Sequence, residues 1–365
     1  MKAARNPRID CLRAISMLLI VVQHYVFWGL KPLNLDVFQI TGSGGALLNY
    51  LSMETLYLLS CIGVNCFVMI SGYFTITKTT HRCDSLLRLW FTTVFYSVIL
   101  FLVSLFLSNG QLTLSTDDLK ALLHCFFPVY SRQYWFISTY IAVMLIAPYF
   151  SIMVKNITRK NFRYLLVILF CLTFMFPYGQ QFAGGMSVLW MLFVYLVGGY
   201  IRLYGIDSKI SNNIVLIFFG IIFILVLGFI AYDIAQNHGT PNALLRLHGF
   251  ASDSPIFFLS LSCFIWAIRK EESKVSSISK LWIRLSPYVL AVYLIHMNKY
   301  FYPFIWKIFI PETNSIPIAL HALMCSLIIF FVCIIIDLLR SMLFRVSVDR
   351  LIEIIKSKIN IYYEK

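Results

Sequence analysis

The chain has 365 residues, of which 60% are hydrophobic and only 13% are charged, and its formal net charge is +14. A soluble domain averages about a quarter charged residues, so this composition excludes an ordinary soluble domain and predicts an integral membrane protein. A basic balance can also suit a nucleic-acid-binding protein, but the placement of the charges along the chain argues against nucleic acid as a partner.

Apolar segments recur along the whole chain. A helix needs about 20 mostly apolar residues to cross a bilayer, and hydropathy predicts about ten such spans. They lie near residues 10–29, 56–76, 86–107, 134–153, 163–178, 186–204, 212–235, 253–268, 283–305 and 317–339. The first is too long for a cleavable signal peptide and has no small-residue cleavage site after it. The predicted fold class is therefore all-α, a polytopic membrane protein with about ten transmembrane helices.

The lysines and arginines gather between alternate spans. With both termini placed in the cytoplasm, 22 of the 30 Lys and Arg residues fall in inner segments and six in outer ones. An excess of basic residues on the cytoplasmic side is typical of membrane proteins. We therefore expect a multi-pass protein of a cell membrane, of the bacterial inner-membrane type, with cytoplasmic N- and C-termini.

The chain shows no internal repeat and no interdomain linker. We expect one transmembrane domain over residues 1–340 and a cytoplasmic tail over residues 341–365. Apolar residues recur at helical spacing in the tail with basic residues between them, which predicts an amphipathic helix on the inner leaflet. The nine cysteines are scattered and form no CxxC pair, so we interpret them as small apolar residues and predict no metal site.

The first span carries two ionisable side chains, Arg13 and His24. At 100° per residue they lie on one stripe of a helix, roughly 16 Å apart along its axis. Ionisable groups inside a bilayer are costly and usually face a bundle interior or a wet cavity, so the pair indicates a polar path from the cytoplasm. Two alternatives stay open. Arg13 could snorkel and pair with Asp10, and His24 could be a structural histidine.

Five segments in order resemble one family. The segment RIDCLRAISMLLIVVQHY (8–25) resembles the first span of the acyltransferase 3 family, in which an arginine, ten residues and a histidine follow one another. Four further segments resemble the polysaccharide O-acetyltransferase branch of this family: GVNCFVMISGYF (63–74), YWFISTYIAVMLIAPYF (134–150), YLVGGYIRLYG (195–205) and VYLIHMNKYFYPFIW (292–306). The resemblance extends from Arg5 to the last span, and so over nearly the whole chain.

The resemblance implies a membrane O-acyltransferase. It would move an acyl group, most commonly acetyl, from cytosolic acyl-CoA to a hydroxyl of an extracytoplasmic or lipid-linked polysaccharide. Histidine is the usual general base for a poorly nucleophilic hydroxyl, and arginine suits the phosphates of the donor. We therefore expect His24 to be catalytic, as general base or acyl relay, and Arg13 and Arg88 to bind acetyl-CoA.

Three more residues are candidates for substrate binding. Trp135 could stack on a sugar or on the donor, or belong to the interfacial belt of tryptophans. Tyr293 and His296 lie together in the ninth span, where His296 could equally be structural. We expect Ser71 and Gly72 to allow close helix packing.

A second class of function stays open. A transporter or flippase for a glycan would also line its path with polar residues. The chain lacks the internal symmetry that many transporters show, and the family resemblance favours the enzyme. The identity of the acyl group, the sugar and its hydroxyl, and the oligomeric state are left open by the sequence.

Overall fold

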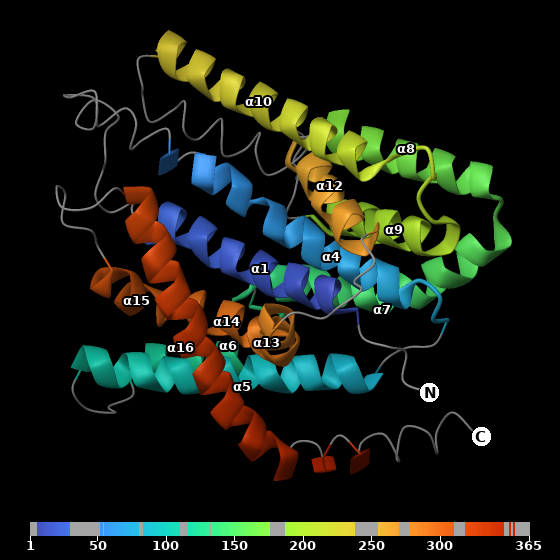
Figure 1. Cartoon of the computed structure of the whole chain (residues 1–365). Coiled ribbons are helices and arrows are strands. Elements are labelled where there is room, and N and C mark those ends of the chain that lie inside the picture. The colour runs from blue at the N-terminus through green and yellow to red at the C-terminus, as the bar shows by residue number, and fades with distance from the viewer. Residues whose placement is uncertain are drawn as a thin grey trace.

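The structure is a computed structural model, and part of the chain is described in it. The described residues are 6–29, 52–53, 55–79, 83–109, 115–131, 133–175, 187–237, 255–269, 277–309, 318–346, 350–351 and 353–354. Among them the regular elements are all helices (Figure 1). These are α1 (Pro7–His24), the π-helical turn η1 (Tyr25–Gly29), α4 (Ile62–Thr75), α5 (Cys83–Asn109), α6 (Thr116–Phe126), α7 (Trp135–Asn156), α8 (Arg159–Met175), α9 (Val188–Tyr204), α10 (Asn212–Asn237), α12 (Pro255–Arg269), α13 (Ser277–Leu285), the short 3₁₀ turn η4 (Ser286–Tyr288), α14 (Val289–His296), α15 (Tyr302–Ile308) and α16 (Ile318–Val346).

Several of these helices have the length and composition of membrane spans. Within the described part of the chain, five helical segments are long and apolar enough to cross a bilayer: Pro7–Gly29, Thr55–Thr75, Asp84–Ser108, Trp135–Lys155 and Ile318–Phe344. Three shorter apolar helices cover Val188–Tyr204, Asn212–Gly228 and Pro255–Arg269. The predicted all-α membrane fold is confirmed.

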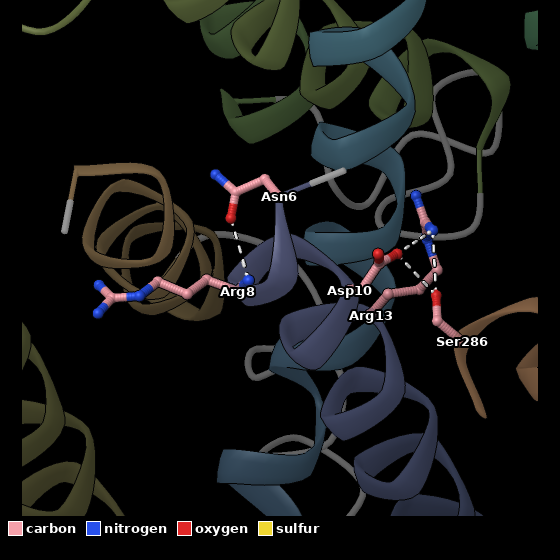
Figure 2. Close-up of polar contacts among 5 residues, drawn as sticks. All are labelled: Asn6, Arg8, Asp10, Arg13 and Ser286. Atoms are coloured by element: carbon pink, nitrogen blue, oxygen red, sulfur yellow. Dashed lines mark hydrogen bonds and ion pairs between the residues drawn. The ribbon is translucent and has the colours of Figure 1, made fainter. Parts of the chain in front are cut away.

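Helix α1 lies in the middle of the bundle. Its start is set by Asn6, whose side chain accepts a hydrogen bond of 3.0 Å from the backbone N–H of Arg8 (Figure 2), and by Pro7 in the first turn, both common features of helix N-termini. The helix packs against α4, α12, α13, α14 and α16 (Figure 1). Polar side chains on α1 therefore meet other helices more than lipid.

Helices α4 and α9 approach each other through glycines. A Cβ atom added to Gly72 would lie 1.9 Å from the carbonyl oxygen of Tyr195, and one added to Gly198 would lie 2.2 Å from that of Met69. Small residues at such crossings let helix backbones come close in membranes. The expected packing role of Gly72 is confirmed, and this crossing holds one side of the bundle that surrounds α1.

The ninth predicted span, 283–305, is not one continuous helix. The chain there runs as α13, η4, α14 and α15 in turn. The first break contains Pro287, which has no backbone N–H and clashes with the preceding turn. Pro303 itself causes no break, because it lies in the first turn of α15, where proline is tolerated.

The second break follows His296 and is held by Asn298 and Tyr134. Asn298 is fully buried, and its side-chain oxygen accepts hydrogen bonds from the N–H groups of Tyr300 and Phe301 at 3.0 and 3.2 Å. Its amide donates to the Tyr134 hydroxyl at 2.8 Å, and that hydroxyl donates to the carbonyl of Leu294 at 3.0 Å. Broken helices are tolerated at membrane depth only when buried groups are satisfied within the protein, and this network meets that condition.

The last helix is longer than predicted. Helix α16 continues beyond residue 340 to Val346. Of the predicted tail helix, residues 347–349, 352 and 355–365 lie outside the described residues.

Candidate active site

The Arg13–His24 stripe of α1 faces the broken ninth span. The Arg13 guanidinium contacts Ser286 in η4, and His24, the last residue of α1, contacts His296 at the end of α14. Residue numbers increase in the same direction along both segments, so α1 and α14 run parallel. The structure therefore places Arg13 and His24 on one face of α1, as the helical spacing required. It also shows which segment this face contacts, namely the broken ninth span.

His24 and His296 form a hydrogen-bonded pair. Nδ1 of His24 lies 2.9 Å from Nε2 of His296, and Nδ1 of His296 lies 2.5 Å from the carbonyl oxygen of Val292. His296 is fully buried, whereas His24 is only partly buried. Directly after His24 the helix changes to the π-helical turn η1, a local geometry that is frequent at functional sites. The nitrogen of His24 that faces away from His296 is Nε2.

Arg13 belongs to a three-residue cluster at the other end of the stripe (Figure 2). Its Nη1 donates to Oδ1 of Asp10 at 3.0 Å and to Oγ of Ser286 at 3.2 Å, and Ser286 also donates to Oδ1 of Asp10 at 2.9 Å. The Asp10 side chain is 5% exposed, but that of Arg13 is 27% exposed. The pairing with Asp10 that the sequence suggested is present, and it anchors a guanidinium that still reaches open space.

That open space is a cavity of about 300 Å³. Arg13, Lys78, Ser85 and Ser286 contribute polar groups to its wall. Most of the remaining wall is apolar or aromatic, formed by Phe67, Leu86, Leu89, Phe136, Tyr140, Met144, Ala147, Pro148, Tyr195, Val289 and Leu290, with Ser71 and Thr75. A cavity that combines two cationic side chains with a mostly apolar wall suits a ligand with an anionic head and a less polar arm.

Two aromatic rings separate this cavity from His24. Phe136 lines the cavity and meets the ring of Tyr293 at 5.7 Å between centroids. The Tyr293 ring in turn lies 6.2 Å from the His24 ring and 6.2 Å from the His296 ring. Tyr293 is 4% exposed. It therefore forms a partition between the end of the cavity and the histidine pair, instead of an open binding surface.

Arg88 lines a second cavity, of about 350 Å³. Ser85, Leu89 and Leu290 line both cavities, so the two adjoin. The far wall of the second cavity holds Arg340, whose Nε lies 2.5 Å from Oδ1 of Asp337. Arg13 and Arg88 are thus brought to neighbouring spaces, not to one.

Trp135 stands apart from both cavities. It is the first residue of α7, is partly buried, and packs edge-on against Phe136 with 6.0 Å between centroids.

Sequence reasoning did not single out Lys78, Tyr134 or Asn298. Only the position of Lys78 directly after the second predicted span could have indicated it, because the roles of Tyr134 and Asn298 depend on contacts between distant segments.

The described residues include no group of three or more His, Cys, Asp and Glu side chains that could hold a metal ion.

Comparison with known proteins adds the family. Residues 6–338 match the acyltransferase 3 family, described as an acyltransferase domain. No curated protein and no solved structure matches the chain significantly. The matched region includes the whole Arg13–His24 stripe, both cavities except the wall formed by residues 340–344, and the broken ninth span that carries His296. The chain belongs to the acyltransferase 3 family and is a membrane acyltransferase.

Proposed function

We propose that this acyltransferase moves an acyl group, most commonly acetyl, from cytosolic acyl-CoA to a hydroxyl of an extracytoplasmic or lipid-linked polysaccharide. One observation carries the proposal. Arg13, at the charged end of the apolar cavity, and His24, beyond its aromatic end, lie on one face of α1. Such an arrangement suits a donor whose phosphates stay near one membrane surface while its thioester reaches into the bilayer.

Arg13 and Arg88 hold the donor phosphates in this proposal. Acyl-CoA carries phosphate groups at its nucleotide end, and the adjoining cavities offer one arginine each, with Lys78 nearby. The apolar part of the first cavity, which Phe67 and Phe136 help to line, accommodates the thin pantetheine arm. For the thioester to reach His24, the ring of Tyr293 has to turn aside, because it lies between Phe136 and His24.

His24 activates the acceptor hydroxyl. Its Nε2 takes the hydroxyl proton as the oxygen attacks the thioester carbonyl. The C–S bond then breaks, and the protonated His24 gives that proton to the leaving sulfur, so that CoA leaves as the thiol. In the relay version, the same nitrogen attacks the thioester carbonyl, the C–S bond breaks and CoA leaves as the thiolate. The acceptor oxygen then attacks the acyl carbon, the bond to Nε2 breaks, and the hydroxyl proton passes to the thiolate. Both versions require an unprotonated Nε2.

Transfer by the purified protein tests this function. We expect reconstituted protein with acetyl-CoA labelled in the acetyl group to label a surface polysaccharide or its lipid-linked precursor. Mass spectrometry of surface glycans from cells with and without the protein then identifies the sugar and the acyl group. Glycans that carry the same acyl groups in both cells, together with no transfer in vitro, would contradict the proposal. They would favour transport of a glycan instead.

Replacing the two arginines should weaken donor binding. Each arginine-to-phosphate hydrogen bond contributes about 1.5–3 kcal/mol, so Arg13→Ala and Arg88→Ala should each raise the Kd for acyl-CoA about 10- to 150-fold. Arg13→Lys should restore binding only in part, because lysine cannot pair bidentately. Calorimetry on detergent-solubilised protein measures the change.

Two controls accompany this measurement. Arg163→Ala removes an exposed arginine of α8 that lines neither cavity, and should leave the Kd unchanged. Thermal unfolding shows whether Arg13→Ala also destabilises the fold by leaving the buried Asp10 without its ion pair. Donor affinity equal to wild type in both cavity variants would reject the assignment.

Both termini are cytoplasmic in this proposal. The excess of basic residues in the inner segments supports it. The parallel course of α1 and α14 agrees with the ten-span count, because the first and ninth spans of such a chain run in the same direction, but it is the same for either orientation of the termini. Reporter fusions after residues 158 and 208 should report cytoplasm, and a fusion after residue 120 should report the outside. A cytoplasmic signal at residue 120 would be incompatible with ten spans.

A further inference from the structure

The geometry points to His296 as a positioning residue that holds His24 in the tautomer with Nδ1 protonated and Nε2 unprotonated. The inference rests on the proposed function only in so far as Nε2 of His24 is taken to be the nitrogen that accepts the proton or the acyl group. The tautomer itself follows from the hydrogen bonds.

The first step is the proton on His296. Its Nδ1 lies 2.5 Å from the carbonyl oxygen of Val292, and a carbonyl oxygen can only accept, so Nδ1 of His296 carries a proton. The ring is fully buried and its aromatic neighbours are His24, Tyr293 and Trp306. A second proton would place a positive charge among these buried rings, and no ion pair between His296 and a carboxylate is present in the described part of the chain, so the charge would be costly. His296 is therefore neutral, and its Nε2 is an acceptor.

The second step is the proton on His24. Since Nε2 of His296 accepts, Nδ1 of His24, 2.9 Å away, must donate to it. A neutral imidazole carries one N–H, so Nε2 of His24 bears the lone pair. The chain of bonds from the Val292 carbonyl through His296 to His24 leaves the lone pair on the nitrogen of His24 that faces away from His296.

The third step is what happens when His24 takes up a proton. The cation that forms keeps its Nδ1–H donor to Nε2 of His296, and this bond strengthens because the donor is now charged. The hydrogen bond from Nδ1 of His296 to the Val292 carbonyl also makes Nε2 of His296 a better acceptor, which stabilises the protonated His24 further. A base oriented by a second group is the arrangement that nucleophilic and general-base sites share.

The surroundings fix the His296 ring in place. His296 ends α14, and the break after it is held by Asn298 and Tyr134. The rings of Tyr293 and Trp306 pack edge-on against it at 6.2 and 6.3 Å. The break in the ninth span thus has a consequence for the site, because it sets the depth and direction of the ring that orients His24.

Nitrogen-15 NMR of histidine-labelled protein tests the tautomer without any assay of transfer. Protonated and unprotonated imidazole nitrogens have clearly different shifts, and the His24→Gln variant identifies the signals of His24. We expect a protonated Nδ1 and an unprotonated Nε2 in wild type. In His296→Phe, which removes the acceptor, we expect signal from the opposite tautomer to appear. A protonated Nε2 on His24 in the wild type would overturn the inference.

Kinetics supply the second test. His296→Phe should lower kcat about 10- to 100-fold, by analogy with the loss found when a group that orients a metal-binding histidine is removed, with the KM for acyl-CoA within twofold of wild type. His296→Gln should keep most of the rate, because its side-chain oxygen can still accept from Nδ1 of His24. The exposed His124 of α6 supplies the control His124→Gln, which should match wild type.

The outcomes separate the two proposals. Equal losses in His296→Phe and His296→Gln would assign the effect to packing and overturn the positioning role, as would a wild-type rate in His296→Phe. If His296→Phe does not fold, the wild-type NMR spectrum and His296→Gln still decide the question. The predicted tautomer in a protein that transfers no acyl group would instead contradict the proposed function alone.

Discussion

Replacing His24 with alanine, asparagine or glutamine should abolish acyl transfer while acyl-CoA still binds. Loss of a general base typically lowers the rate 10²- to 10⁴-fold, and loss of a relay nucleophile is at least as severe. Donor affinity should stay near wild type, because the arginine end of the stripe lies roughly 16 Å away along α1. Transfer of labelled acetyl and donor affinity are measured on the same preparations.

The asparagine variant is the matched control for the histidine pair. Its side-chain N–H occupies about the position of Nδ1 and can still donate to Nε2 of His296, whereas neither amide can accept a proton at neutral pH. A purely structural His24 leads to a different result, in which asparagine or glutamine restores transfer and alanine lowers the folded yield. Near-normal transfer in either amide variant would remove His24 as the base.

Substituting Gly72 with alanine should cost most of the folded protein. The added Cβ would lie 1.9 Å from the carbonyl oxygen of Tyr195, a backbone atom that cannot move aside without separating α4 from α9. Overpacking a well-packed core costs about 1–3 kcal/mol and occasionally more, and a contact this short belongs at the upper end. Gly198→Ala, at 2.2 Å from the carbonyl of Met69, should behave alike.

Gly220 provides the matched control for this prediction. It also lies within a helix, α10, but a Cβ added there meets no atom within 4 Å. Alanine favours helix over glycine by about 1 kcal/mol, so Gly220→Ala should leave stability unchanged or raise it. Monodisperse yield in detergent and the thermal unfolding midpoint measure all three variants. If Gly72→Ala unfolds at the same temperature as Gly220→Ala, the close crossing of α4 and α9 is wrong.

Hydropathy and helical periodicity were enough for the fold class and for one face of the site. Both patterns depend on one helix at a time. About 20 apolar residues make a span, and a turn of 100° per residue puts Arg13 and His24 on one stripe. The small side chains of the second span likewise indicated close packing at Gly72. For these features the cause lies within a single segment, so the sequence by itself determined them.

The ninth span shows where local reasoning ends. Its hydropathy resembles that of a continuous helix, and its prolines were visible in the sequence. Yet the second break follows His296, before Pro303, because Tyr134 and Asn298 satisfy the backbone groups there. The partner of that break, Tyr134, comes from the start of the fourth predicted span, and no local pattern relates the two.

Only the tertiary structure decided what His24 faces. His296 lies 272 residues along the chain from His24, and Ser286 lies 273 residues from Arg13. The sequence placed Arg13 and Arg88 at one site, but the structure separates them into adjoining cavities, and it puts Tyr293 between the first cavity and His24. Dihedral preference and hydropathy act over a few residues, whereas these pairings depend on how whole helices pack. The position of the stripe on α1 can therefore be predicted from the sequence, but the groups that orient its histidine cannot.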